Sequence, residues 1–463
     1  MAAPVDHPRT DEVTARLLRG TELHLNHYGA PRLPFACTGG RGLELDVIDL
    51  TPEHRGRRMR LLDASGGYAS AALGVGHEVV LRALARGVTG AGSATDELGS
   101  LERAELLDRL FGPGGLWTGH FPTGEYHVSG RNSGSEGNEL ALRLVLESRY
   151  DPRRLRRRPG KEHRDTVLAF EGAWHGWTDG LVPLLNRRHY QAGLPGQVPP
   201  EHGGVRVEHL PFGSTEALTG YFAAHADRLL AVVVEPVQGD AGVLRPPPGY
   251  LRGLSELCRA EGVLLVADEV LTFAKTGDWF AMRDDAGPVP TDVTVIGKYL
   301  GMGAVSTSMV IARRDLTVRA SGAVATSDLR PLTCAVIRDG VEHVVAEGLL
   351  PASAEVGAHL AERLHRDLVE RFPRVFTEVR GTGVMLGVEL TAEAGTRIGA
   401  LRRALLDAGV YVEFMAGAGR RSGGLRYVHP TMRVAPPLIT GRADADEIAA
   451  RLAAGTEALL AAW

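Results

Sequence analysis

Six short runs of apolar residues, separated by amphipathic stretches, dominate the middle of the chain. Each run is largely continuous rather than alternating, which is typical of strands that are covered on both faces. The runs are HVSGR (127–131), DTVLAF (165–170), RLLAVVVEP (228–236), GVLLVADE (262–269), TDVTVIG (291–297) and TSMVIAR (307–313). Between two of them, apolar residues recur at helical spacing over 250–262, as in a strand–helix–strand crossover. The pattern predicts an α/β fold with a mostly parallel sheet.

The same pattern predicts how the chain is divided. The strand-rich part forms a large α/β domain over residues 71–335. An N-terminal segment, residues 1–70, and a C-terminal α+β segment, residues 336–463, flank it and are expected to pack together as a smaller domain. Helical periodicity is strongest at the end of the chain, over residues 445–463.

Composition narrows the functional classes. The chain has 463 residues, 44% of them hydrophobic and 23% charged, with a formal charge of −4. This balance gives no case for nucleic-acid or anionic-membrane binding. A basic run at 153–164 has no interleaved aromatic residues and is interpreted as a solvated loop. No signal peptide or membrane-length apolar run is expected, and the three scattered cysteines match no metal or disulfide pattern. A cytoplasmic location follows as the expectation.

Lysine is unusually scarce. Only three of the 52 basic residues are lysines, namely Lys161, Lys275 and Lys298. Arginine serves equally well for surface charge, but it cannot lose its proton and act as an amine nucleophile. One of these three lysines is therefore a candidate for chemistry that arginine cannot perform.

Lys298 is the strongest candidate because it follows a buried strand. Asp268 ends the strand run at 262–269, and it is 30 residues earlier, about one strand–helix–strand unit. Ligands bind at the carboxyl edge of such a sheet, so both side chains are expected in one pocket. Asp268 has apolar neighbours, and a buried carboxylate there needs a cationic partner. The alternative for either residue is an ordinary loop or turn position.

Three further segments carry candidate ligands. RNSGSEGNELALRLV (131–145) predicts a turn into a helix whose capped start suits a phosphate, although it could be a capped helix that binds nothing. EGAWHGW (171–177) offers an indole that could stack on a heteroaromatic ring or simply belong to the core. Glu235, at the end of the run at 228–236, and Asp240, just after it, are further candidates, although they could also merely begin a turn.

Taken in order, the motifs SGSE, EGAWHG, EPVQG, ADEV, GK and RVAPPL (433–438) resemble those of the class III, fold-type-I, pyridoxal-5′-phosphate (PLP) dependent aminotransferases. Within that family, the chain looks like the glutamate-1-semialdehyde aminomutases and ornithine aminotransferases. The resemblance extends from residue 61 to residue 438. It implies a mostly parallel seven-stranded sheet in the large domain and PLP held as a Schiff base on Lys298.

The resemblance also implies residue roles. Gly134 and Ser135 bind the cofactor phosphate, Trp174 and Val270 cover the two faces of its ring, and Asp268 pairs with the ring nitrogen. Thr326 matches a phosphate-binding threonine that the partner subunit supplies, which implies a homodimer. Lys298 then moves the proton in a ping-pong transfer of an amino group from a small amine or amino acid to a keto acid or aldehyde.

On the substrate side, the chain departs from the family pattern. Asp240 stands where a glutamate often pairs with the arginine of the last motif, here Arg433, and Arg433 could hold a substrate carboxylate. Because aspartate is shorter, that pairing is in doubt. Thr272 and Lys275 replace a glycine and an arginine, GMG (301–303) replaces three glycines, and Arg330 is a candidate for pointing into the site.

These changes keep three hypotheses open. The first is an aminotransferase, in which the amino group moves between two molecules. The second is an epimerase, racemase or aminomutase on the same scaffold, which would need no external keto acid. The third is a PLP-binding domain without turnover, against which the intact pair of Asp268 and Lys298 argues.

Overall fold

A computed structural model of the chain describes residues 10–25, 33–89, 97–151, 153–154, 156–187, 204–318 and 323–463. The first nine residues, and residue 155 of the basic run, lie outside these ranges, so the expectations about them stay predictions. In the described part, no helix is both long enough and apolar enough to cross a membrane.

A seven-stranded sheet forms the centre of the molecule, with strand order β4-β12-β11-β8-β7-β5-β6. Its strands are β4 (Tyr126–Arg131), β5 (Thr166–Phe170), β6 (Arg206–Leu210), β7 (Leu229–Val234), β8 (Leu264–Glu269), β11 (Val293–Ile296) and β12 (Ser308–Arg313). Only β12 runs against its neighbours, so six strands are parallel. The predicted fold class is confirmed, and the six predicted runs are all strands. The seventh strand, β6, was not among the predicted runs.

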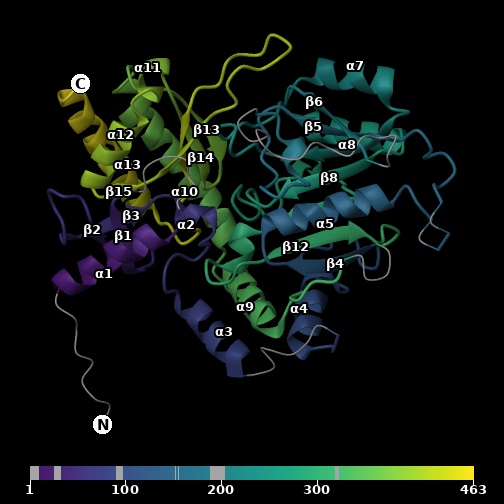
Figure 1. Cartoon of the computed structure of the whole chain (residues 1–463), viewed down its shortest axis with the longest axis horizontal. Coiled ribbons are helices and arrows are strands. Elements are labelled where there is room, and N and C mark those ends of the chain that lie inside the picture. The colour runs from purple at the N-terminus through teal and green to yellow at the C-terminus, as the bar shows by residue number, and fades with distance from the viewer. Residues whose placement is uncertain are drawn as a thin grey trace.

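Helices cover both faces of this sheet, as the continuous apolar runs require (Figure 1). Alternate residues of β7 face opposite sides: Ala231 and Val233 pack with the side chains of α5 (Gly134–Glu147), while Val232 and Val234 pack with α7 (Thr215–His225) and α8 (Tyr250–Ala260). Beyond β11, a third cluster joins the sheet to α3 (Glu78–Thr89), α4 (Leu101–Phe111) and α9 (Pro331–Ala346). Burial from both sides fixes the strand ends against one another.

Two four-stranded sheets lie to the left in Figure 1, with α10, α12 and α13 packed around them. The first contains β1 (Phe35–Arg41), β2 (Glu44–Asp49), β3 (Arg58–Asp63) and β15 (Val410–Tyr411), and the second contains β13 (Phe376–Thr382), β14 (Met385–Leu390), β17 (Thr431–Val434) and β16 (Glu413–Met415). The helices of this part are α1 (Thr10–Leu23), α2 (Gly66–Ala69), α10 (Leu349–Leu364), α11 (Ala392–Gly395), α12 (Ile398–Asp407) and α13 (Arg442–Ala461). The pairing of β15 with β3 joins the two ends of the chain in one sheet. The domain boundaries near residues 70 and 335 stay a prediction.

Candidate active site

The carboxyl ends of β5, β7, β8 and β11 meet at one edge of the large sheet, and a cavity of about 550 Å³ opens there. Nine of the ten residues predicted for the site line this cavity: Gly134, Ser135, Trp174, Glu235, Asp240, Asp268, Val270, Lys298 and Arg433. The exception is Thr326. The edge of the large sheet and strand β17 of the second small sheet thus bring together residues that are up to 299 positions apart, from Gly134 to Arg433.

Lys298 follows β11 in a backbone conformation that is rare for a residue with a side chain. Its φ of 47° lies in the left-handed region, the kind of local strain that folded structures retain at functional positions. Burial lowers the pKa of the Lys298 amine to about 8, and the positive charge of Arg433 acts in the same direction. An amine with this pKa is partly uncharged near neutral pH and can act as a nucleophile.

Asp268 is held by donors that come from two other segments. In β8, Leu264 and Val266 face α5, and the alternation of a strand turns Asp268 to the same side. Its Oδ2 atom accepts a hydrogen bond from Asn138 Nδ2 at 2.7 Å. It also lies 2.9 Å from His175 Nδ1 and accepts from it in the tautomer that carries the proton on Nδ1. Its Oδ1 atom accepts from the N–H of residue 270 at 3.0 Å. The carboxylate is therefore fixed in direction and hydrogen-bonded at both oxygens.

Asn138 and His175 were not predicted. Both occur within motifs that the sequence analysis used, but the motifs do not show which way either side chain points. Asn138 lies one turn into α5 on the face that packs on the sheet, and it also donates to the carbonyl of His175 at 2.8 Å. The only sequence signal was that a buried carboxylate at residue 268 needs hydrogen-bonding partners.

Glu235 forms the wall between β7 and the tryptophan turn. Its Oε1 atom accepts a hydrogen bond from the backbone N–H of Trp174 at 2.9 Å, and Oε2 accepts from Gly239 N–H at 3.3 Å. Burial raises the pKa of Glu235 well above its usual value, and the nearby charge of Asp268 adds to this. The indole of Trp174 stacks on Trp177, with ring centroids 5.2 Å apart. Glu235 thus fixes the turn that carries the two stacked tryptophans.

The start of α5 lies at the same edge and lines the cavity. The predicted cap of this helix is Ser133, which accepts a hydrogen bond from Glu136 N–H; the sequence alone left Ser133 and Ser135 as alternatives. A Cβ atom on Gly134 would lie 2.5 Å from Val270 Cγ1, and one on Gly176 would lie 2.5 Å from Ser135 Oγ. Glycine is therefore needed at both positions for the backbone to come this close to the cavity wall, and the helix start offers N–H groups suited to a phosphate.

The pairing of residue 240 with Arg433 is not formed. Asp240 instead forms an ion pair with Arg187 at 2.9 Å, and Arg187 also donates to the carbonyl of Gly417 at 2.8 Å. Arg433 is held by Glu413, whose Oε2 atom accepts from Nε at 3.1 Å and also from Nη2. Neither Arg187 nor Glu413 was predicted, because each contact joins segments far apart in the sequence.

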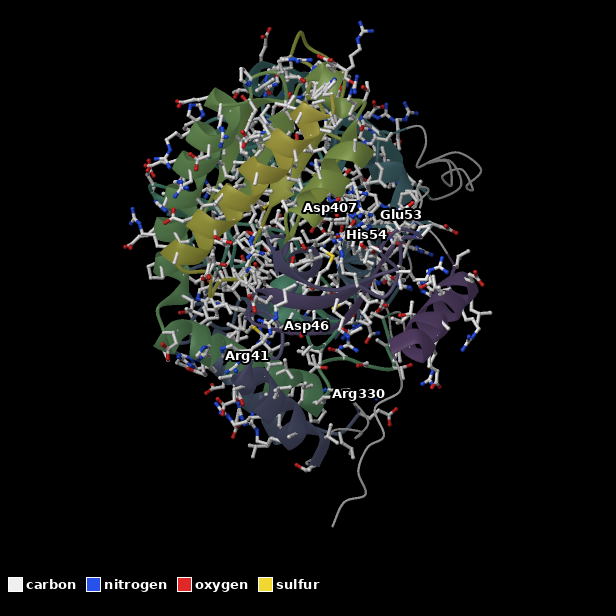
Figure 2. All side chains as sticks on the ribbon, turned by 90° about the vertical axis from the view of Figure 1, so that its left-hand side faces the viewer. Arg41, Asp46, Glu53, His54, Arg330 and Asp407 are labelled. Atoms are coloured by element: carbon white, nitrogen blue, oxygen red, sulfur yellow. The ribbon has the colours of Figure 1, made fainter. Side chains whose placement is uncertain are left out.

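Thr326 and Arg330 lie outside the cavity of their own chain. Thr326 is exposed, and its carbonyl accepts a hydrogen bond from Arg330 Nη2 at 2.8 Å. Arg330 precedes α9 on a face that also presents Arg41 and Asp46 (Figure 2). Arg330 therefore does not line the cavity of its own chain.

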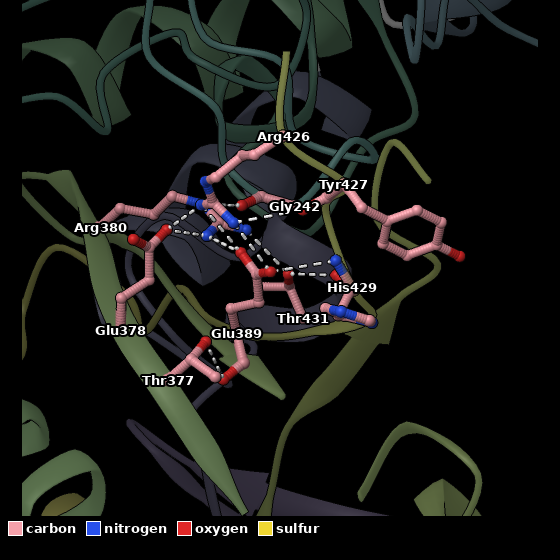
Figure 3. Close-up of polar contacts among 9 residues, drawn as sticks. All are labelled: Gly242, Thr377, Glu378, Arg380, Glu389, Arg426, Tyr427, His429 and Thr431. Atoms are coloured by element: carbon pink, nitrogen blue, oxygen red, sulfur yellow. Dashed lines mark hydrogen bonds and ion pairs between the residues drawn. The ribbon is translucent and has the colours of Figure 1, made fainter. Parts of the chain in front are cut away.

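A polar network ties the loop after β7 to the second small sheet (Figure 3). Arg380 donates to the carbonyl of Gly242 and, at 2.9 Å, to Thr431 Oγ1. It also pairs with the buried Glu389, which accepts from Arg426 at 3.1 Å. Thr431 is in β17, the strand that carries the cavity arginine, so this network holds the loop and the strand in register around the cavity.

Lys275 is buried next to the site without lining it. Its Nζ atom lies 3.5 Å from the centroid of the Tyr299 ring and has no hydrogen-bond partner among the described residues. Burial lowers the pKa of Lys275 well below its usual value, and the charges of Lys298 and Arg433 add to this. The folded chain therefore disfavours the charged form of this amine.

We expect Lys275→Met to raise the free energy of unfolding at pH 7 by about 1–3 kcal/mol, because it removes an unpaired buried amine. The pKa of Lys275 is lower in the folded than in the unfolded chain. The cost of burying its charge is therefore fully present below the folded-state pKa, and it disappears as the pH rises towards the unfolded-state pKa of about 10.4. Denaturant unfolding at pH 7 and pH 10 measures the difference, which should shrink at pH 10. Lys275→Arg, which stays charged, should lower the free energy of unfolding. A Lys275→Met variant that is less stable than wild type at pH 7 would contradict this interpretation.

Comparison with known proteins agrees with this geometry. Residues 53–455 match the family described as aminotransferase class-III. The chain is 30% identical over 397 residues to the mitochondrial ornithine aminotransferase of Oryza sativa subsp. japonica, covering 83% of this chain and 75% of that protein. It is 33% identical to an ornithine aminotransferase of Bordetella pertussis over 72% of this chain and 73% of that one. The solved ornithine aminotransferase of Toxoplasma gondii has the same fold, with a TM-score of 0.78, 22% identity and coverage of 98% and 99%.

The fold and the site define a fold-type-I PLP enzyme. The chain belongs to the class-III aminotransferases: it is a PLP-dependent aminotransferase. The relatives are named as aminotransferases, which favours transfer of an amino group between two molecules over the isomerase alternative.

Proposed function

We propose that this enzyme transfers an amino group from a small primary amine or amino acid to a keto acid or aldehyde, using Lys298 as the cofactor anchor and proton carrier. The observation that supports this most strongly is the meeting of Lys298, Asp268 and the start of α5 around one cavity. A buried amine, a fixed carboxylate and a helix N-terminus are the three groups that PLP needs at its aldehyde, ring nitrogen and phosphate.

PLP, when bound, supplies an aldehyde that reacts with amines and a ring that accepts electrons from the amine-bearing carbon. In this proposal, Lys298 would hold the cofactor covalently and later move the proton at that carbon. Asp268 would pair with the ring nitrogen and keep it protonated, while Trp174 and Val270 would cover the ring on its two sides. The amides at the start of α5, with the hydroxyl of Ser135, would hold the phosphate.

A homodimer is part of the proposal. Thr326 lies outside the cavity of its own chain, on an exposed stretch before α9, which is where a residue serving a second copy would have to lie. The family resemblance gives it the role of a phosphate ligand across that interface. The cytoplasmic location stays a prediction from the sequence.

A screen of amino donors tests the function. Purified holoenzyme is mixed with one amine at a time and no keto acid, and the visible absorption of bound PLP is followed. Ornithine, which the relatives' names indicate for those proteins, is the first donor to try, followed by amines without a carboxylate. We expect amino donors of one chemical class to abolish the visible absorption of bound PLP, with one equivalent of donor used per subunit. Isomerisation of a substrate with no keto acid present would contradict the proposal.

A further inference from the structure

Arg433 is the one arginine that lines the cavity among the described residues, and its charge is already matched from within the protein. Glu413 and Arg433 are directly opposite each other in the antiparallel pair of β16 and β17. Both side chains are nearly inaccessible, with 3% and 5% exposed. Since each is fixed by its strand, the pair needs no loop movement to form.

Glu413 contacts Arg433 on the side of the guanidinium that faces away from the cavity. Arg433 lines the cavity, whereas Glu413 does not. The second carboxylate oxygen of Glu413, Oε1, is enclosed and has no hydrogen-bond partner among the described residues. Arg433 is therefore the main group that offsets the Glu413 charge, and neither residue is available to balance a third charge.

The other acid near this end of the cavity is committed elsewhere. Asp240 pairs with Arg187, which is itself tied to the Gly417 carbonyl, so Asp240 is not placed to exchange with Glu413. A substrate carboxylate that reached Arg433 would meet attraction from the guanidinium and, from the carboxylate paired directly behind it, repulsion from Glu413. The two effects oppose each other in the same poorly solvated region.

We propose that Glu413 determines substrate specificity by neutralising Arg433. This rests on the proposed function. The favoured substrates are primary amines whose portion next to Arg433 is uncharged, such as a hydroxyl, carbonyl or amide group that accepts a hydrogen bond from the guanidinium. Amines with a carboxylate in that position are disfavoured.

Binding of glutarate to the holoenzyme tests the charge at Arg433 without any turnover, because glutarate has neither an amine nor a keto group. We expect Glu413→Gln to tighten glutarate binding by about tenfold or more in titration calorimetry, since it leaves Arg433 charged and unmatched. Glu378→Gln is the matched control: Glu378 pairs with Arg380 outside the cavity, and glutarate affinity should not change.

A double variant, Glu413→Gln with Arg433→Gln, keeps the shapes and removes both charges. If the pair is neutral in the native enzyme, its glutarate Kd stays within about threefold of wild type. A tenfold weakening would show that Arg433 already anchors carboxylates, and unchanged binding in Glu413→Gln alone would overturn the inference as well. Glutarate binding does not depend on transamination. If no donor converts bound PLP, the proposed function fails, but the glutarate measurement still tests the pairing of Glu413 with Arg433.

Discussion

Lys298→Ala should abolish covalent attachment of PLP and reduce turnover by at least about 10³-fold, since a positioned acid–base group alone contributes about 10²–10⁴-fold. Lys298 is the only lysine lining the cavity in the described part of the chain. The other buried lysine, Lys275, lies against the Tyr299 ring outside the cavity and cannot replace it. Turnover per bound PLP and the visible spectrum of the purified variant measure the loss.

Two controls separate a missing amine from a damaged fold. Lys161→Ala changes a lysine outside the cavity and should leave turnover unchanged. Added methylamine should restore part of the activity of Lys298→Ala, because a small free amine can enter the space left by the side chain. A Lys298→Ala enzyme with full activity would rule out Lys298 as anchor and proton carrier.

Continuous apolar runs predicted the strands of the large sheet because burial on both faces leaves no polar alternation. β5, β7, β8 and β11 are buried along their whole length. β6 is an edge strand with the sequence RVEHL, and its residues are only partly covered. Its short polar pattern does not stand out from a loop, which is why it was not predicted.

One substitution in the glycine turn after Lys298 shows what sequence reasoning missed. Met302 takes a glycine's place and has a left-handed φ of 53°. A Cβ on Gly340 of α9 would lie 2.5 Å from Met302 Cγ, so the missing side chain in α9 makes room for the extra one in the turn. The larger residue in the turn and the glycine in α9 that makes room for it are 38 residues apart, so no local sequence pattern predicts their contact.

The site was predictable where it depends on strand ends and unpredictable where it depends on side-chain contacts. Lys298 and Asp268 follow from topology, since parallel strands end at one edge. Glu413 carries the same signal as Asp268, an acid within an apolar strand that needs a partner. The sequence does not say that the partner is Arg433 rather than a ligand, because that depends on the register of two short strands.

The second large effect is expected at Asp268, where Asp268→Asn should lower kcat by about 10²–10³-fold, the usual cost of removing one charge that stabilises a transition state. The amide has nearly the same shape but lacks the negative charge that the proposed function assigns to the ring nitrogen. It also cannot accept at both ends: Asn138 and His175 meet one oxygen and the N–H of Val270 meets the other, so the new NH₂ group faces a donor.

Glu269 provides the matched control, because it is the next residue of β8 and faces the opposite side of the sheet. Its carboxylate accepts hydrogen bonds from Thr272 Oγ1 and from the N–H groups of Ala281 and Met282. Burial raises the pKa of Glu269 to about 7. Since both of its oxygens accept from donors, Glu269→Gln turns an NH₂ group towards a donor just as Asp268→Asn does, and the two variants share that structural cost. Glu269→Gln should keep kcat within about tenfold of wild type, since it lies away from the reacting atoms. Equal losses in the two variants would mean that Asp268 matters only for the fold, whereas a loss confined to Asp268→Asn assigns its charge to the chemistry.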